Sequence, residues 1–325
     1  DGAAPARATW EQKPLLTAST TRVFGAPSLY TDRLTGRTLV SQEEGLSPLG
    51  STTDITDDDG DTFLPSQGSG MPSCVDHQTL GGGPFHAPLT SPLYPNAIYY
   101  ASQCVADAVI SLSVDGGVTF APSVPMYTVA QCDGLHGHVK VGPDGTVYIP
   151  NKACSGNVPL LNGGEVSVVV SEDNGLTWTV RPVPGSATKE DDDPSVGVAS
   201  DGSIYLGWQS ADGHPRIAVS HDKGQTWINV RDVGAALGIE NCVFPAVVAG
   251  DGGLTTGRAA FAFYGTTRAG ANYDQPEFTG DWYLYIATTY DGGNTWTTQN
   301  VTPGDPVQRA SGICAPQACV QFSAS

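Results

Sequence analysis

Three side chains of the sequence belong to the types that acid–base cleavage of a glycosidic bond requires. Asp76 and Asp193 are carboxylates, His136 is an imidazole, and each lies just before an apolar-alternating segment. Two carboxylates cleave such a bond when one is shielded enough to hold a proton near neutral pH while the other stays ionised. We therefore interpret Asp76, His136 and Asp193 as candidate catalytic residues, on the condition that the fold brings them together.

Further polar side chains flank these candidates or the strands expected to carry them, and we interpret them as substrate-binding residues. They are Arg22, His77, His138, Lys152, Glu190, Asp192, Glu240, Arg258 and Tyr264. A tyrosine in an alternating strand, such as Tyr264, is also typical of a core position.

The acidic run of residues 190–193 has two other interpretations. It fits a solvated loop whose last residue, Asp193, caps the backbone that follows, because Asp is favoured in turns. It also fits a calcium site, since Ca²⁺ binds clustered carboxylate oxygens, and residues 57–61 form a similar run. His136 and His138 share one strand face, which suits a metal, but no third ligand is evident. We assign no metal and no cofactor, with calcium as the alternative.

The elements that must position these groups are recognised from an eight-residue phrase, Ser/Thr-x-Asp-x-Gly-x-Thr-aromatic, which occurs five times. Its Asp is predicted to accept backbone N–H bonds within a hairpin turn, its Gly to supply positive φ, and its aromatic ring to pack between neighbouring sheets. Intervals of 49 to 69 residues between copies suit one four-stranded sheet per copy. The phrase occupies residues 56–63, 113–120, 171–178, 220–227 and 289–296.

This phrase matches the Asp box, and the chain therefore resembles the sialidase-like Asp-box (BNR-repeat) β-propeller superfamily. The resemblance covers residues of about 20–300. It implies an all-β propeller of four-stranded antiparallel blades, six in the sialidases themselves, and a structural role for the Asp-box aspartates. These are Asp58, Asp115, Asp173, Asp222 and Asp291.

We expect one domain over residues 1–325, with blades at about 20–65, 74–122, 132–180, 190–230 and 242–300. The remaining residues are too few for a full sixth blade, so we expect an incomplete closing blade from both termini, a chain that is truncated, or strand addition by another chain at an open edge. Aligning the blade entrances predicts a ring around the central channel. It contains Ala26, Asp76, His136, Asp193 and Phe244.

The sequence departs from the sialidase pattern at the first blade. Sialidases have Phe-Arg-Ile-Pro there, and the arginine helps to bind the substrate carboxylate; here the stretch is Phe-Gly-Ala-Pro, with Gly25 in the arginine position. A guanidinium fork is hard to replace in carboxylate recognition, and Arg22 lies three residues upstream.

Composition restricts the partners. The formal charge of −18 argues against nucleic acids and anionic lipid surfaces, and no apolar run reaches the ~18 residues that span a bilayer. Seven cysteines without a zinc-type pair favour a secreted or cell-surface protein with disulfides. By blade position we expect Cys74–Cys104, Cys132–Cys154 and Cys314–Cys319 bridges, with Cys242 left over.

Two functions follow from these expectations. The first is a secreted, sialidase-like propeller that binds a glycan at the channel mouth and hydrolyses it as an exo-glycosidase. The alternative is a non-catalytic propeller for binding, adhesion or assembly, with self-association or a partner strand at the open edge. Fold analogy alone does not decide between them.

Overall fold

The computed structural model describes residues 11, 13, 25–43, 50–67, 76–104, 107–154, 164–188, 193–250 and 257–313. Within these residues the regular elements are strands, apart from one short 3₁₀ turn, η1 (Ala235–Leu237). No helix in this part of the chain has the length and apolarity to cross a bilayer.

The strands form five antiparallel sheets of consecutive strands. The first contains β1 (Gly25–Thr31), β2 (Thr38–Glu43), β3 (Ser51–Thr56) and β4 (Leu64–Pro65). The second contains β5 (Asp76–Gly83), β6 (Ala97–Cys104), β7 (Asp107–Ser113) and β8 (Val124–Tyr127). The third contains β9 (Cys132–His136), β10 (Lys140–Val141), β11 (Val147–Cys154), β12 (Glu165–Ser171) and β13 (Thr179–Pro182). The fourth contains β14 (Ser195–Val198), β15 (Ile204–Gln209), β16 (Pro215–Ser220) and β17 (Ile228–Asp232). The fifth contains β18 (Asn241–Ala249), β19 (Ala259–Thr266), β20 (Tyr283–Thr289) and β21 (Thr297–Asn300).

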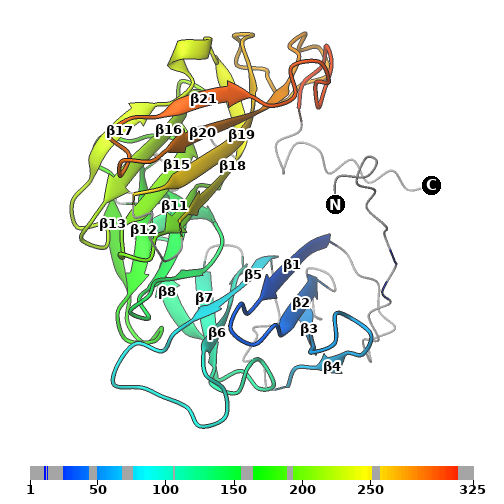
Figure 1. The fold of residues 1–325 in the computed structure, drawn as a ribbon, viewed down its shortest axis with the longest axis vertical. Helices are drawn as coiled ribbons and strands as arrows, with labels where there is room; N and C mark the ends of the chain where they lie inside the picture. The colour runs from blue at the N-terminus through cyan, green and yellow to red at the C-terminus, as the bar shows by residue number, and fades with distance from the viewer. Residues whose placement is uncertain are drawn as a thin grey trace, which may run out of the picture.

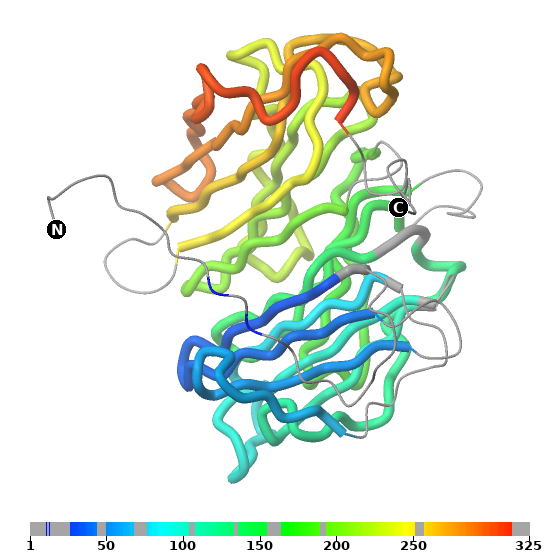
Figure 2. The backbone as a smooth tube through the Cα atoms, turned by 90° about the vertical axis from the view of Figure 1, so that its right-hand side faces the viewer, coloured from blue at the N-terminus to red at the C-terminus, as the bar shows by residue number. Residues whose placement is uncertain are grey.

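The sheets follow one another around the molecule in chain order, from blue to orange in Figure 1, with the first strand of each sheet innermost. Figure 2 shows the first sheet (blue) and the last (yellow to red) toward opposite ends of the molecule. In the third sheet β9 and β10 both pair with β11 and together form the innermost strand. The predicted all-β propeller of four-stranded antiparallel blades is confirmed, and we call the sheets blades 1 to 5. The sixth, closing blade stays a prediction.

The five repeated turns join the third and fourth strands of their blades and share one hydrogen-bond pattern. In each turn the Asp Oδ1 accepts the backbone N–H of the Thr four residues later, at 2.8–2.9 Å. The first Ser or Thr of the phrase accepts the N–H of the Gly with its hydroxyl oxygen. That glycine has a φ of 84–88° in every copy, a conformation that costs glycine little.

The apolar core is divided into clusters that lie between successive blades. One cluster joins Leu39 and Ile55 of blade 1 to Tyr100 and Phe120 of blade 2, and similar clusters join the next three pairs of blades. Phe120 is a phrase aromatic, and Trp178, Trp227 and Trp296 pack against the other three clusters. The predicted packing of these aromatic rings between blades is confirmed, whereas Phe63 of the first copy is half-exposed.

Each turn also contacts the blade before it. A Cβ added at Gly117 would lie 2.4 Å from Leu39 of blade 1, and one at Gly293 would lie 2.6 Å from Val219 of blade 4. At blade 1 the equivalent neighbour of Gly60 is the side chain of Lys13, whose Nζ donates to Asp61 at 2.6 Å. A residue near the start of the chain therefore occupies the position that a preceding blade has elsewhere.

The inner strands are joined by hydroxyl groups around the channel. Ser28 Oγ of blade 1 accepts the backbone N–H of Leu80, and Ser195 Oγ of blade 4 accepts that of Val247. Thr79 Oγ1 accepts the N–H of Val139 in the same way between blades 2 and 3. These contacts fix the rotation of blades 1 to 3 relative to one another, and that of blade 5 relative to blade 4.

A disulfide joins Cys132 of β9 to Cys154 of β11, and this predicted bridge is confirmed. Cys242 is buried as a thiol. The predicted Cys74–Cys104 and Cys314–Cys319 bridges involve residues or side chains outside the described part of the chain.

We expect Asp173→Ala to lower the free energy of unfolding by about 1–2 kcal/mol, because the backbone N–H groups of Leu176 and Thr177 lose their acceptor. Chemical denaturation measures this change. Leu176→Ala is the control, since that exposed side chain makes no such bond, and equal stability of the two variants would contradict the role of the aspartate.

The stability of the fold should fall between about pH 4 and pH 2. Hydrogen bonds from the following threonines hold the pKa of Asp58, Asp222 and Asp291 below the usual range, that of Asp291 at about 2. In Asp115 and Asp173 burial works in the opposite direction and the hydrogen bonds outweigh it, so their pKa values are also lowered. A carboxyl with a lowered folded-state pKa stabilises the fold above its unfolded pKa, and this contribution is lost as the pH falls through the folded value. Thermal unfolding measured at pH values from 7 to 2 tests this prediction. The melting temperature of Asp291→Asn should fall less over this range than that of the wild type.

Candidate functional site

The inner strands begin at one end of the channel, which we call the upper mouth, and each copy of the repeated turn lies at the opposite, lower end. The hydroxyl bonds between inner strands align Ser28, Thr79 and Ser195 as equivalent residues. Two residues before each of these come Ala26, His77 and Asp193. The ring at the upper mouth is completed by His136 and Phe244, two residues before His138 and Ala246.

The register corrects the predicted ring at blade 2. Asp76 pairs with Gln103, and the pairing resumes at Thr79 after a bulge; Val243 and Ala246 flank the same bulge in β18. Asp76 is therefore equivalent to Val243, and His77 is equivalent to Phe244. His77 and Phe244 also have similar positive φ angles, 52° and 55°. The ring position belongs to His77, because the bulge adds a residue that counting along the sequence does not reveal.

Three consecutive blades bring polar side chains together at the upper mouth. His77 Nε2 of blade 2 lies 2.8 Å from Asp193 Oδ2 of blade 4, and these side chains are 26% and 21% exposed. The ring of His136, from the blade between them, meets His77 edge to face with centroids 5.7 Å apart. His138 makes a second edge contact with His77, at 6.3 Å.

The imidazole of His136 is fully buried and neutral. Its Nδ1 lies 3.0 Å from the carbonyl oxygen of Gly137, which can only accept, so we assign the proton to Nδ1 and an acceptor lone pair to Nε2. No described residue donates to this buried Nε2. Burial, followed by the charge of His77, lowers the pKa of His136 to about 4.

Below the mouth, a cavity of about 570 Å³ follows the channel and is lined by residues of all five blades, among them Arg33, His138 and Lys140. Desolvation, followed by the charge of Arg33, lowers the pKa of Lys140. Desolvation also lowers the pKa of His138, with His77 and Lys140 acting in the same direction. Neither Arg33 nor Lys140 belongs to a sequence motif, although Lys140 precedes the Asp-Gly turn of an inner hairpin.

The structure brings some of the other predicted residues to the upper mouth. Tyr264 pairs with Val243, and its ring meets that of Phe244 at 6.0 Å. Lys152 is buried in β11, next to Asn151, which pairs with His136. Glu240 lies on the same face, but its carboxylate is 3.9 Å from His214 Nε2 at the rim.

Arg258 does not reach this site. It precedes Ala259, which pairs with the last residue of β18, and this places Arg258 at the lower end, where it stacks on Tyr290 at 5.1 Å. Arg22, Glu190, Asp192 and the side chain of Asp76 lie outside the described part of the chain. Across the described residues, no group of three or more His, Cys, Asp or Glu side chains is arranged to hold a metal ion.

No protein-family model matches the chain, and no curated protein matches its sequence. Among solved structures, the chain is similar to a protein of unknown function from Dyadobacter fermentans (TM-score 0.52, 13% identity, 90% of this chain and 84% of that one covered). It is similar to a polysaccharide lyase described as an ulvan lyase (TM-score 0.52, 12% identity, 88% and 70% covered). A sialidase from Streptococcus pneumoniae also matches (TM-score 0.50, 11% identity, 84% and 60% covered). These similarities show a shared sialidase-like β-propeller fold.

We expect the imidazole of His136 to titrate near pH 4 and to carry its proton on Nδ1 above that value, because burial disfavours the charged form. Nitrogen-15 NMR spectra recorded from pH 3 to pH 8 report both quantities. His136→Asn identifies the resonance by its loss, and a midpoint near the ordinary histidine value would contradict the burial described here.

Proposed function

We propose that this chain is a secreted or cell-surface carbohydrate-active propeller that binds a glycan at the upper mouth and hydrolyses its glycosidic bond. The observation that carries the proposal is the pairing of His77 with Asp193 over 2.8 Å, beside the neutral His136. The five turns fit the Asp boxes of the sialidase-like superfamily, and the similar folds include a sialidase and a polysaccharide lyase. The Cys132–Cys154 disulfide supports an oxidising location.

In the proposed reaction the His77–Asp193 pair transfers the proton. The pair holds one proton between an imidazole nitrogen and a carboxylate oxygen. It delivers this proton to the glycosidic oxygen as the bond breaks, and it recovers a proton from the attacking water. The Asp193 carboxylate also stabilises the positive charge that develops on the sugar. His136 adds no charge and offers its Nε2 lone pair to a hydroxyl donor.

The aromatic residues at the upper mouth can contact the apolar part of a sugar. Phe244 is 38% exposed at the mouth and packs edge to face on Tyr264. A pyranose has an apolar C–H face, so it can lie against this pair while its hydroxyls meet the polar side chains of blades 2 to 4.

A non-catalytic binding or assembly propeller is the second candidate. It is favoured by Gly25, which begins β1 where sialidases have an arginine, because a glycine cannot supply a guanidinium for a substrate carboxylate. If the protein is a non-catalytic propeller that self-associates, it hydrolyses no glycoside, and its molecular mass in solution rises with protein concentration.

We expect Asp193→Asn and His77→Gln each to reduce glycosidase turnover by about 10²- to 10⁴-fold, because each removes half of the proton-transfer pair. A panel of aryl glycosides, including a sialoside, measures the release of the chromophore. Arg258→Ala is the matched control, since that residue lies at the lower end and should leave turnover unchanged. Turnover that persists in both mouth variants would exclude the assigned roles, and no turnover by the wild type would favour the binding propeller.

A further inference from the structure

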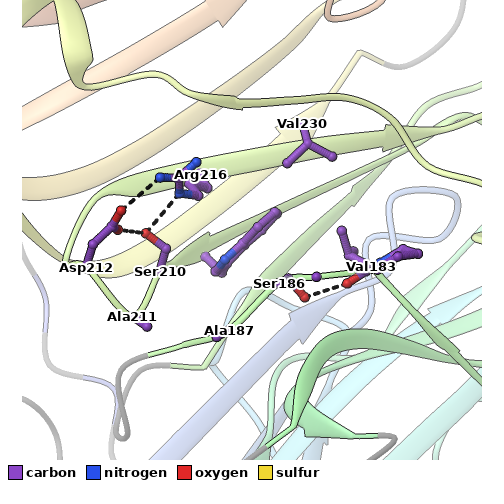
Figure 3. Close-up of a pocket in the computed structure, with 11 residues that line it drawn as sticks. Val183, Ser186, Ala187, Ser210, Ala211, Asp212, Arg216 and Val230 are labelled. Carbon is purple, nitrogen blue, oxygen red and sulfur yellow. Dashed lines mark hydrogen bonds and ion pairs between the residues drawn. The ribbon is translucent and has the colours of Figure 1, made fainter.

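A second cavity, of about 380 Å³, lies at the outer rim between blades 3 and 4 (Figure 3). The segment after β13, from Val183 to Ala187, forms one wall, and the turn between β15 and β16, from Ser210 to Asp212, forms the other. Ser195 at the start of β14 pairs with Gly207 near the end of β15, so this turn belongs to the face of the upper mouth.

The cavity and the mouth are also connected through the chain. Thr188 bridges to Ser210 at the cavity and donates its hydroxyl to the carbonyl oxygen of Lys152 in β11. The cavity wall is therefore joined to β11, whose Asn151 pairs with His136 at the mouth.

The cavity contains a buried hydrogen-bond donor that is not satisfied by the described residues. Trp208 contributes to its lining, is only 1% exposed, and its indole Nε1 has no partner in the described structure. Trp178 and Trp296 donate their indole N–H groups to the carbonyl oxygens of Gly175 and Gly293, whereas the indole of Trp227, which does not line this cavity, is also unpaired among the described residues. An unpaired buried donor is costly, and an acceptor oxygen in the cavity would remove that cost.

The polar wall is held rigidly and carries no net charge. Arg216 donates from Nη2 to Asp212 Oδ2 at 2.8 Å and from Nε to Ser210 Oγ at 3.1 Å, as Figure 3 shows. Its Nη1 donates to no described residue, so this group is available to a ligand. Burial alone would raise the pKa of Asp212, but the hydrogen bonds from Ser210 and Arg216 outweigh it and hold this pKa below the usual range. The carboxylate therefore stays ionised. One cation and one anion side by side favour a neutral ligand over an acidic one.

The opposite wall is apolar, with Val183, Pro184 and Ala187 in its lining, and Val230 of β17 adds an apolar side chain on the side of Arg216. A sugar ring combines an apolar C–H face with hydroxyls that donate and accept. We infer that this cavity is an accessory site for one neutral sugar unit of the glycan whose cleavage is proposed at the upper mouth. The C–H face packs on the aliphatic wall, and the hydroxyls bond to Trp208, Arg216 and Asp212. This inference rests on the proposed function for its ligand, but it is tested by binding alone.

The test is affinity electrophoresis of the full chain in native gels that contain galactan, xylan, mixed-linkage β-glucan or galactomannan. Ala187→Trp fills the rim of the cavity from an exposed position and keeps the backbone carbonyl that accepts the N–H of Ala211. Arg216→Gln is the second variant, because it removes the guanidinium without adding bulk. Leu176→Trp adds the same exposed indole at the lower end and is the matched control.

We expect at least one polysaccharide to retard the wild type, and Ala187→Trp to weaken this retardation at least tenfold in dissociation constant. Arg216→Gln should weaken it as well, whereas Leu176→Trp should be retarded like the wild type. Absence of retardation in every gel, or equal retardation of Ala187→Trp and the wild type, overturns the accessory site. If Ala187→Trp loses retardation but the wild type hydrolyses no aryl glycoside, the accessory site is supported and the proposed hydrolase activity is excluded. The failure of one proposal can therefore be distinguished from the failure of the other.

Discussion

Each of blades 2 to 5 is locked to the blade before it by the turn between its third and fourth strands. The aspartate and the first hydroxyl of the turn satisfy the backbone N–H groups internally, which frees the glycine to approach the neighbouring blade without a side chain. The aromatic residue that ends the turn then fills the space between the blades. The angle between successive blades follows from this contact, and it determines which side chains meet at the channel.

Much of this architecture could be predicted because the phrase is local. The turn needs only eight consecutive residues, so its five copies mark the blades in the sequence itself. Four ring positions also follow from the spacing between the start of an inner strand and its Asp-Gly turn, or from the proline that follows the ring residue. The ring position in blade 2 required the strand pairing, since the bulge around His77 shifts the register by one residue.

Other parts of the site depend on contacts between distant segments, which spacing cannot supply. The sequence placed Arg258 near a hairpin but did not reveal at which end of the blade it lies. Glu240 looked like a channel residue, yet its carboxylate faces His214 on the rim. The cavity between blades 3 and 4 arises from the segment after one blade and a turn of the next, and neither has a motif. Trp208 belongs to no motif, and its unsatisfied indole N–H is evident only from the residues that surround it in the fold.

The inter-blade clusters also determine how the molecule comes apart. Among the described residues they form four successive interfaces along a row of blades 1 to 5, in which blades 2 to 4 each have two neighbours. Cooperative units arranged in a row lose their ends first, as repeat arrays do. The catalytic pair proposed here is drawn from blades 2 and 4, and the fully buried histidine comes from blade 3. Fraying of either terminal blade would therefore leave the polar half of the mouth assembled.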